Sequence, residues 1–451
     1  MCSSVEWKDL EDESNQIIRG ILPQPSKQFT VDWSRLGSRL LTLCLLDIFA
    51  GAQAFPLNQL EKRIEHAVGE ALFAPISSGQ NIAHELITAH VTWMLKCSNQ
   101  LEQKYGIRVH EFQPGWGDPH PPGLTTTRVT VPTGQVYFAK PGRKPRQFND
   151  QLERLSGHGI VASGEALPFR SGALYAAKRA DSSPAVSRPQ FWAAAGRFVS
   201  LALLDGFSDG HYENVIASDG RLTILDDETI GNPQVRASRR VEDTLLLETR
   251  AGVSGMIVGA FVAKSSPIRR RPHPGIVRRG TTVYLETFSR QSSIRCTLTD
   301  VYGTADENRE AFLRGYQDAW SRCHELHDSV TSSAPGSRLV MRPTGVYSRI
   351  IERLLYVEGA NELAYRYERC RSILSLLPTL RGEAALIDAE AFDLANGWIP
   401  RFLYCDRHTV ATANGRLIEL STPLTPLQSQ SVAQARNPLE PLRSWLTTLN
   451  I

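Results

Sequence analysis

The stretch of sequence that decides the fold reads SDGHYENVIA over residues 208–217 and LTILDDET over residues 222–229. Both parts contain a short aliphatic and β-branched run, and Asp219-Gly220 lies between the two runs. An Asp-Gly pair in this position predicts a β-hairpin. Residues just before the first strand and just after the second are therefore expected at the same end of the hairpin.

The polar residues at that end have the types and spacing of a phosphoryl-transfer site. Such a site needs a carboxylate that accepts a hydroxyl proton, and an amide oxygen and a second carboxylate that hold Mg²⁺. Asp209 precedes Asn214 by five positions, as in the catalytic loop of protein kinases, and Asp226 follows twelve positions later. In the alternative interpretation, these carboxylates belong only to turns and a strand end.

The upstream sequence favours the phosphoryl-transfer interpretation. Residues 107–111, 125–131 and 135–140 predict three strands, and a loop rich in Gly and Pro, residues 113–123, follows the first. Lys140 ends the third strand. Glycines let backbone N–H groups approach phosphate oxygens, and a nearby lysine neutralises phosphate charge. We therefore predict that Lys140 binds the phosphates of ATP.

These motifs and one further segment resemble the dehydratase part of the class II (LanM-type) lanthipeptide synthetases. Residues 117–120 (Gly-Asp-Pro-His) match the family's Gly-Asp-Ser-His loop, and residues 137–143 match its Tyr-Lys-Pro-Arg strand with small insertions. Residues 209–214 match Asp-Leu-His-Tyr-Glu-Asn, and residues 225–229 match Ile-Asp-Leu-Glu-Thr. Residues 338–344 match Arg-x-x-x-Arg-x-Thr. The motifs occur in the family's order along the chain.

The resemblance implies an α+β fold with a bilobal, lipid-kinase-like (protein-kinase-like) catalytic core, an N-terminal helical elaboration and extra C-terminal elements. It implies two reactions at one site. Ser or Thr of a ribosomally made precursor peptide is phosphorylated by ATP, and elimination of the phosphate then leaves dehydroalanine or dehydrobutyrine. The implied cofactors are ATP and Mg²⁺.

The resemblance also assigns roles for the phosphorylation reaction. Asp209 acts as the base or orients the acceptor hydroxyl, and His211 supports it. Lys140 is the phosphate-binding lysine. Asn214 and Asp226 are the Mg²⁺ ligands.

Five other residues take roles from the resemblance. Asp118 and His120 belong to the loop that faces the phosphates, and Glu228 is a further metal-binding or basic carboxylate. Arg338 and Thr344 match the residues that the family uses for elimination, where a cation and a hydroxyl hold the departing phosphate. Without the family, the last two would be interpreted as a surface arginine and a strand threonine.

Two departures from the family pattern leave other functions open. Gly210 replaces the usual leucine of the catalytic loop, and Trp398 replaces the aspartate of the family's Gly-Asp-Ile-Pro-Tyr-Phe segment. One alternative is a kinase-like phosphotransferase that stops at the phosphoester. The other is a non-catalytic, pseudokinase-like module that binds the precursor peptide.

The resemblance covers the dehydratase part and not the zinc-binding cyclase domain of these synthetases. Cys323-His324 is only superficially similar to the cyclase's Cys-His pair, and the spacing of Phe312, Tyr316 and Cys323 predicts a helix that faces the core. We therefore expect a stand-alone dehydratase. Its expected partners are the precursor peptide and a separate cyclase or other tailoring enzyme.

The composition is that of a globular protein, with 451 residues, 41% hydrophobic and 22% charged. A net charge of +3 gives no reason to expect nucleic acid as a partner. The first residues lack a signal-peptide pattern, and the most apolar run is too short to cross a membrane. Seven cysteines without a Cys-x-x-Cys pair fit reduced thiols. We therefore expect a cytoplasmic protein with no membrane partner.

Three regions are expected from these placements. Residues 1–104 form an N-terminal helical region, residues 105–190 a small β-rich lobe, and residues 191–451 a large, mainly helical lobe with the catalytic loop and the elimination segment.

Within these regions, apolar spacing predicts helices at residues 82–105, 148–155 and 191–204, and β structure is expected near residues 399–417. The arginine-rich residues 269–279 lack periodicity. They are expected to form a solvated loop or a docking site for an acidic leader or phosphopeptide.

Overall fold

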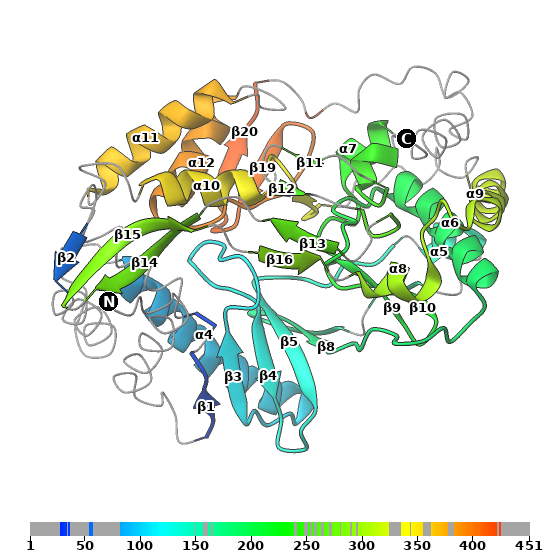
Figure 1. Cartoon of the computed structure of the whole chain (residues 1–451), viewed down its shortest axis with the longest axis horizontal. Coiled ribbons are helices and arrows are strands. Elements are labelled where there is room, and N and C mark those ends of the chain that lie inside the picture. Colours follow the sequence, from blue (N-terminus) through cyan, green and yellow to red (C-terminus); the bar gives the residue numbers. More distant parts are fainter. Residues whose placement is uncertain are drawn as a thin grey trace.

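The computed structural model describes residues 28–33, 35–36, 54–56, 82–148, 150–156, 161–163, 166–238, 241–247, 251–252, 255–256, 259–262, 266–269, 273–279, 281–288, 291–294, 296–323, 335–342, 344–354, 362–377, 383–421 and 424. These residues form a mixed α+β fold, which confirms the predicted class (Figure 1). The first residues of the chain and its most apolar run lie outside the described residues.

A six-stranded sheet carries the upstream motifs. Its order is β1 (Thr30–Val31), β3 (Glu111–Pro114), β4 (Thr127–Thr130), β5 (Val136–Pro141), β8 (Gly172–Ala176) and β7 (Ala166–Phe169). The strands predicted at 125–131 and 135–140 are confirmed as β4 and β5, and the strand predicted at 107–111 lies instead at β3. Lys140 is on β5, paired with Ala173 of β8.

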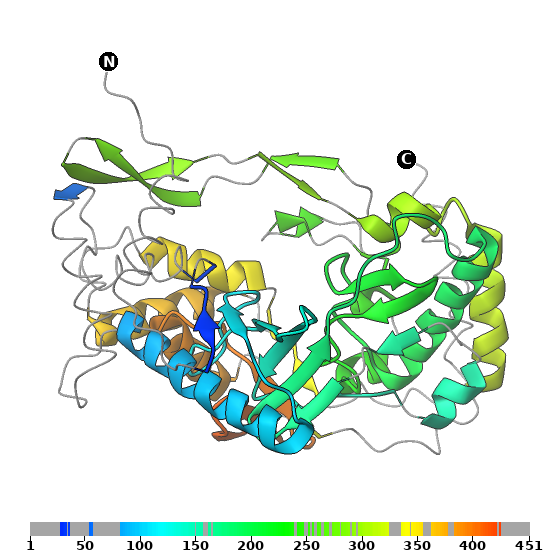
Figure 2. The same cartoon turned by 90° about the horizontal axis from the view of Figure 1, so that it is seen from below.

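One face of this sheet is covered by α4 (Ile82–Tyr105), as predicted for residues 82–105 (Figure 2). Buried side chains of α4, such as Met94 and Leu101, share one core with Phe112 and Val129 of the sheet. The same core contains side chains from three helices late in the sequence: α10 (Thr344–Leu354), α11 (Leu363–Leu376) and α12 (Ala384–Ala395). Part of the predicted large lobe therefore packs with the sheet.

A second core holds the hairpin and its supporting helices. The hairpin strands are β9 (Val215–Ser218) and β10 (Arg221–Ile224), and β10 also pairs with β6 (Val161–Ser163). The helices of this core are α5 (Asp150–Ser156), α6 (Arg188–Asp205), α8 (Thr297–Tyr302) and α9 (Arg309–Cys323). The helices predicted at 148–155 and 191–204 are thus confirmed, and Cys323 is buried in this core as predicted.

A third, smaller core lies in an antiparallel sheet of four strands. Its order is β17 (Arg338–Leu339), β18 (Phe402–Tyr404), β19 (Thr409–Thr412) and β20 (Leu417–Glu419). The β structure predicted near 399–417 is confirmed.

The arginine-rich segment is more regular than its sequence suggests. Its described residues form two ribbons at the periphery of the molecule: β13 (Ser266–Arg269) with β16 (Gln291–Ile294), and β14 (His273–Arg279) with β15 (Thr282–Phe288) and β2 (Ala54–Pro56) (Figures 1 and 2). Arg270 and Arg271 lie outside the described residues. The other short elements are α7 (Pro233–Ser238), η1 (Val241–Thr244), β11 (Ala251–Gly252) and β12 (Gly255–Met256).

Among the described helices, none combines the length and apolarity needed to cross a membrane.

Helices α6 and α9 approach each other at two glycines. A Cβ atom at Gly196 would lie 2.0 Å from the carbonyl oxygen of Phe312, and one at Gly315 would lie 1.8 Å from that of Ala193. Only a residue without a side chain allows this backbone contact. The contact fixes α6, whose C-terminal end leads into the loop of Asp209.

Replacing Gly315 by Ala should therefore destabilise the protein. Overpacking of this kind costs about 1–3 kcal/mol, which exceeds the roughly 1 kcal/mol of helix propensity that alanine adds. Urea unfolding measures the change, with Ser321→Ala at an exposed position of the same helix as the control. The control should alter the free energy of unfolding by less than about 0.5 kcal/mol. A Gly315→Ala variant as stable as the wild type would contradict the close contact.

Candidate active site

The hairpin places the predicted polar residues at one end, as expected. Asp219 and Gly220 form its turn with φ values of 53° and 71°, the left-handed conformation that Asp-Gly turns favour. At the other end, the Leu225 N–H donates to the Asn214 carbonyl oxygen at 2.8 Å. Asn214 and Asp226 therefore leave the hairpin side by side.

Asp209 is held in an unusual backbone conformation. Its φ is 68°, a left-handed value that non-glycine residues seldom adopt but that Asp tolerates best. The Asn214 side-chain amide donates to the Asp209 carbonyl oxygen at 3.0 Å and to its Oδ2 at 3.2 Å. His211 Nε2 lies 3.5 Å from Asp209 Oδ1. The structure thus brings Asp209, His211 and Asn214 together.

Gly210 is required by the packing around this loop. A Cβ atom there would lie 2.6 Å from Leu246 Cδ2 and 2.8 Å from the Thr244 carbonyl oxygen. The Gly210 N–H donates to that same carbonyl oxygen at 2.9 Å. The glycine that departs from the family pattern is therefore matched to a close-packed neighbour in this chain.

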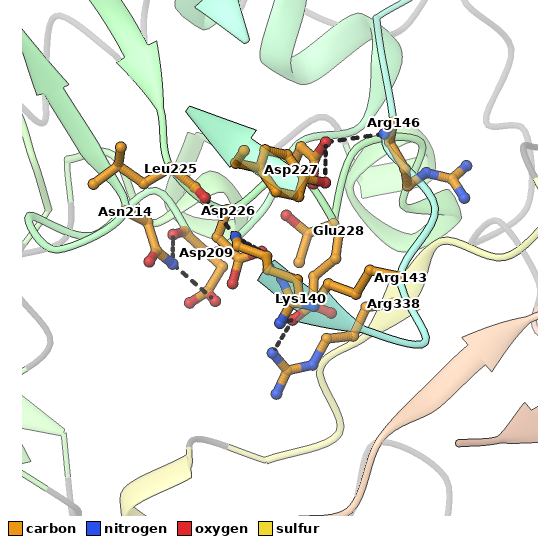
Figure 3. Close-up of polar contacts among 12 residues, drawn as sticks. Lys140, Arg143, Arg146, Asp209, Asn214, Leu225, Asp226, Asp227, Glu228 and Arg338 are labelled. Atoms are coloured by element: carbon orange, nitrogen blue, oxygen red, sulfur yellow. Dashed lines mark hydrogen bonds and ion pairs between the residues drawn. The ribbon is translucent and has the colours of Figure 1, made fainter. Parts of the chain in front are cut away.

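Lys140 joins the six-stranded sheet to the end of the hairpin. Its Nζ donates to the Leu225 carbonyl oxygen at 2.5 Å and lies 3.4 Å from Asp226 Oδ1. Arg143, just after β5, also donates to Asp226 Oδ1. Figure 3 shows these cations close to the carboxylates that follow β10. The predicted pair of Lys140 and Asp226 is thus in direct contact.

Glu228 is surrounded by arginines. Arg143 Nη2 lies 2.9 Å from Glu228 Oε1, Arg338 Nη1 donates to the same oxygen, and Arg401 Nε lies 3.1 Å from Oε2. The Arg338 N–H also donates to the Glu228 carbonyl oxygen at 2.8 Å. Three cations at one carboxylate favour a role as their counter-ion, and its role as a metal ligand or base stays a prediction.

Asp227 points away from this cluster, toward Arg146 (Figure 3), and contacts the six-stranded sheet at Tyr175 of β8. It accepts hydrogen bonds from the Tyr175 hydroxyl at 3.0 and 3.1 Å and from the Arg146 N–H at 2.9 Å. The Tyr175 ring in turn lies 4.8 Å from Lys140 Nζ. Asp227 therefore helps to fix the sheet against the hairpin.

The Gly- and Pro-rich loop is tied to the segment before β18. The Ile399 N–H donates to the Pro119 carbonyl oxygen at 2.8 Å, and His120 Nδ1 lies 2.9 Å from the Ile399 carbonyl oxygen. Because a carbonyl only accepts, Nδ1 carries the proton. Burial, and then the charge of Arg338, lower the pKa of His120 to about 3, so the ring is neutral. Asp118 is exposed on the same loop.

Thr344 does not lie in a strand, as its residue type alone would have suggested. It is the first residue of α10. No hydrogen bond or ion pair between described residues joins Thr344 to the arginines around Glu228. Of the two predicted elimination residues, only Arg338 lies in the cluster.

The carboxylates of the site differ in proton affinity. Burial raises the pKa of Asp209, and the charges of His211 and Arg338 oppose this rise only in part. Burial also acts on Asp226, but Arg143 and Lys140 outweigh it and lower the pKa. Asp209 is therefore the better proton acceptor, whereas Asp226 stays ionised.

Glu228 and Lys140 show the same competition. Burial of Glu228 is outweighed by Arg143, Arg338 and Arg401, which hold its pKa well below the ordinary value. Burial lowers the pKa of Lys140, although Asp226 opposes this change. Glu228 is thus ionised beside its arginines.

The site offers few metal ligands of its own, which suits a metal ion that is also coordinated by the phosphates of a substrate. The described residues contain no group of three or more His, Cys, Asp or Glu side chains that could hold a metal ion. Mg²⁺ is often bound by one or two carboxylates together with substrate phosphates. Because the Asn214 amide nitrogen donates to Asp209, Asn214 Oδ1 is the atom that would join Asp226 in such a role.

A scan of the sequence against models of protein families finds no match, and a search of curated proteins finds no significant relative. The family resemblance therefore rests on the motifs described above.

Sequence reasoning missed several residues of this site. Arg143 ends the segment matched to the family's lysine strand, and Arg401 lies three residues after Trp398, but neither was assigned a role. The pairing of Tyr175 with Asp227 was also missed. The arginine that ends the matched Tyr-Lys-Pro-Arg motif was a signal for Arg143. The contacts of Arg401 and Tyr175 join segments distant in sequence, so no local pattern could have indicated them.

The acid dependence of stability tests the pairing of Glu228. Its folded-state pKa lies below the unfolded value, so its stabilisation is complete above the unfolded pKa and is lost as the pH falls through the folded pKa. Glu228→Gln should be less stable than the wild type at neutral pH, and the difference should shrink in acid. Urea unfolding over a pH series measures this. Glu213→Gln, whose side chain is exposed, is the control, and a pH-independent difference for Glu228→Gln would refute the pairing.

Proposed function

We propose that this protein is a lanthipeptide dehydratase. It phosphorylates Ser and Thr residues of a ribosomal precursor peptide with ATP and then eliminates the phosphate to give dehydroalanine or dehydrobutyrine. We also propose a bilobal, lipid-kinase-like arrangement for its catalytic part. The observation that carries the proposal is the meeting of Lys140 and Asp226 beside the loop in which Asn214 holds Asp209.

In the first reaction, Asp209 accepts the proton of the peptide hydroxyl while the hydroxyl oxygen attacks the γ-phosphorus of ATP. The bond from the γ-phosphorus to the β–γ bridging oxygen breaks, and ADP leaves. A buried carboxylate with a raised pKa is suited to this task. Lys140 and Arg143 neutralise phosphate charge from the sheet side. Asn214 and Asp226 would hold Mg²⁺, which would supply further neutralisation of the phosphate charge.

In the second reaction, the proton on Cα of the phosphorylated residue moves to a base. The electron pair of the Cα–H bond forms the Cα=Cβ bond, and the Cβ–O bond breaks to release phosphate. Asp209, once it has returned its first proton to solvent, is the carboxylate proposed to accept this proton. Arg338 stabilises the negative charge of the departing phosphate, with Thr344 as a hydroxyl donor.

The second candidate is a phosphotransferase that stops at the phosphoester. Two observations favour it. No contact between described residues joins Thr344 to Arg338, and the Arg338 guanidinium is already hydrogen-bonded to Glu228. Incubation with ATP, Mg²⁺ and the precursor peptide encoded beside the gene separates the candidates by mass spectrometry. Loss of one water per modified residue supports the dehydratase, gain of phosphate supports the kinase, and an unchanged bound peptide supports a binding module.

Replacing Asp209 or Asp226 by Asn should reduce all peptide modification by about a hundredfold or more, because the proton acceptor or the metal ligand is lost. Mass spectrometry of the peptide over time measures the rate. Asp219→Asn is the control, since Asp219 is exposed in the turn of the same hairpin and Asn tolerates its left-handed φ. Full activity in Asp209→Asn and Asp226→Asn would remove both residues from the catalytic machinery.

Phosphorylation should also lose rate at low pH with an apparent pKa above 3.8, the ordinary value for aspartate, because Asp209 must be ionised to accept a proton. An acid limb at or below that value would remove Asp209 as the base.

Arg338→Ala and Thr344→Ala should accumulate phosphopeptide, because the residues that hold the departing phosphate are lost while the phosphorylation residues remain. Mass spectrometry of the reaction mixture distinguishes phosphorylated from dehydrated peptide. Arg416→Ala, at an exposed position, is the control and should give the wild-type product. If the active variants never show phosphopeptide, the two-step assignment is wrong.

A further inference from the structure

Arg401 is a buried arginine without a role in the reactions described above. It precedes β18 and is only 7% exposed. Its Nε atom lies 3.1 Å from Glu228 Oε2, yet the angle does not allow a hydrogen bond, and both atoms are buried without a hydrogen-bond partner. Buried polar atoms are costly when they are left unpaired. The arrangement around Arg401 is therefore incomplete.

The charges around Glu228 are also unbalanced. Arg143 shares its charge with Asp226 as well as Glu228. Arg338 and Arg401 both face the single carboxylate of Glu228. Burial, and then the neighbouring arginines, lower the pKa of Arg401 despite the opposing effect of Glu228. An additional anion would relieve this repulsion.

A phosphate group has the acceptor oxygens and the negative charge that would satisfy these arginines. It presents several acceptor oxygens and about two negative charges, and arginine forks bind it with paired hydrogen bonds. A carboxylate offers two oxygens and one charge, and Glu228 Oε2 lies 3.1 Å from Arg401 Nε without a hydrogen bond between them. Arg338 also lies close enough to Asp209 for its charge to act on that carboxyl.

We propose that Arg143, Arg338 and Arg401 form a binding site for a phosphate monoester, in which the Glu228 carboxylate stands in for the phosphate when none is bound. The inference rests on the proposed function, because the ligand is the phosphorylated Ser or Thr between the two reactions. Arg401 is then a phosphate-binding residue, and Glu228 must yield its arginines before the phosphopeptide is held. The site retains the intermediate close to Asp209.

Binding measured without ATP tests this site independently of catalysis. Isothermal titration of the full chain uses N-acetyl-O-phosphoserine amide as the probe, with N-acetylserine amide as the matched uncharged compound. Arg401→Gln should weaken binding of the phosphorylated probe at least about tenfold, since a charge-assisted pair is lost. Arg407→Gln, an exposed arginine nearby, is the control and should bind as the wild type does.

Glu228→Gln should change the affinity for the phosphorylated probe in the opposite direction. Neutralising the stand-in carboxylate removes the competitor of the phosphate, so the probe should bind at least about threefold more tightly. A merely structural cluster predicts no such gain. If Glu228→Gln fails to fold, the comparison of Arg401→Gln with Arg407→Gln decides alone.

Absence of binding by the wild type, or equal binding by Arg401→Gln and Arg407→Gln, would overturn the inference. These outcomes are separable from failure of the proposed function. A protein that modifies no peptide but binds the phosphorylated probe through Arg401 retains the phosphate site and loses the dehydratase assignment. A protein that phosphorylates its peptide but binds the probe without regard to Arg401 retains phosphotransfer and loses this site.

Discussion

The ion pairs of Glu228 are the constraint on which the rest of the site depends. This one carboxylate contacts Arg143 from the end of β5, Arg338 from β17 and Arg401 from the segment before β18. A buried carboxylate is stable only when it is paired, and removal of one partner from a buried ion pair costs about 3–5 kcal/mol. Three segments far apart in the sequence are therefore held in register by a single side chain.

This constraint acts at the place where the hydrophobic cores meet. Lys140 and Arg143 extend from the sheet of the first core, whereas Asp226 and Glu228 follow the hairpin of the second. Apolar packing within each core is strong but without direction, so it does not fix how one core faces the other. Polar contacts across the boundary, such as those of Lys140 and Arg143 with Asp226, are directional and do fix it.

Local sequence predicted the parts of the site that depend on local physics. The Asp219-Gly220 turn fixes the hairpin, and strand alternation places Lys140 at the end of β5. It could not predict Arg401, because the contact of Arg401 with Glu228 spans most of the second half of the chain. Without the family, Thr344 would be interpreted as a strand residue, which is wrong: it begins α10, whose buried Tyr347, Ile350 and Leu354 recur at helical spacing.

The carboxylates of the site differ in pKa because their contacts with arginines and their burial differ. Asp226 and Glu228 contact guanidinium groups directly and stay ionised. Asp209 instead lies 3.5 Å from His211 Nε2 and accepts a hydrogen bond from the Asn214 amide at 3.2 Å. Its left-handed backbone costs about 1–3 kcal/mol, which the two bonds from Asn214 and the close packing of Gly210 offset. Burial raises the pKa of Asp209, and because no hydrogen bond or ion pair between described residues joins its carboxylate to an arginine, the charge of Arg338 opposes this rise only in part.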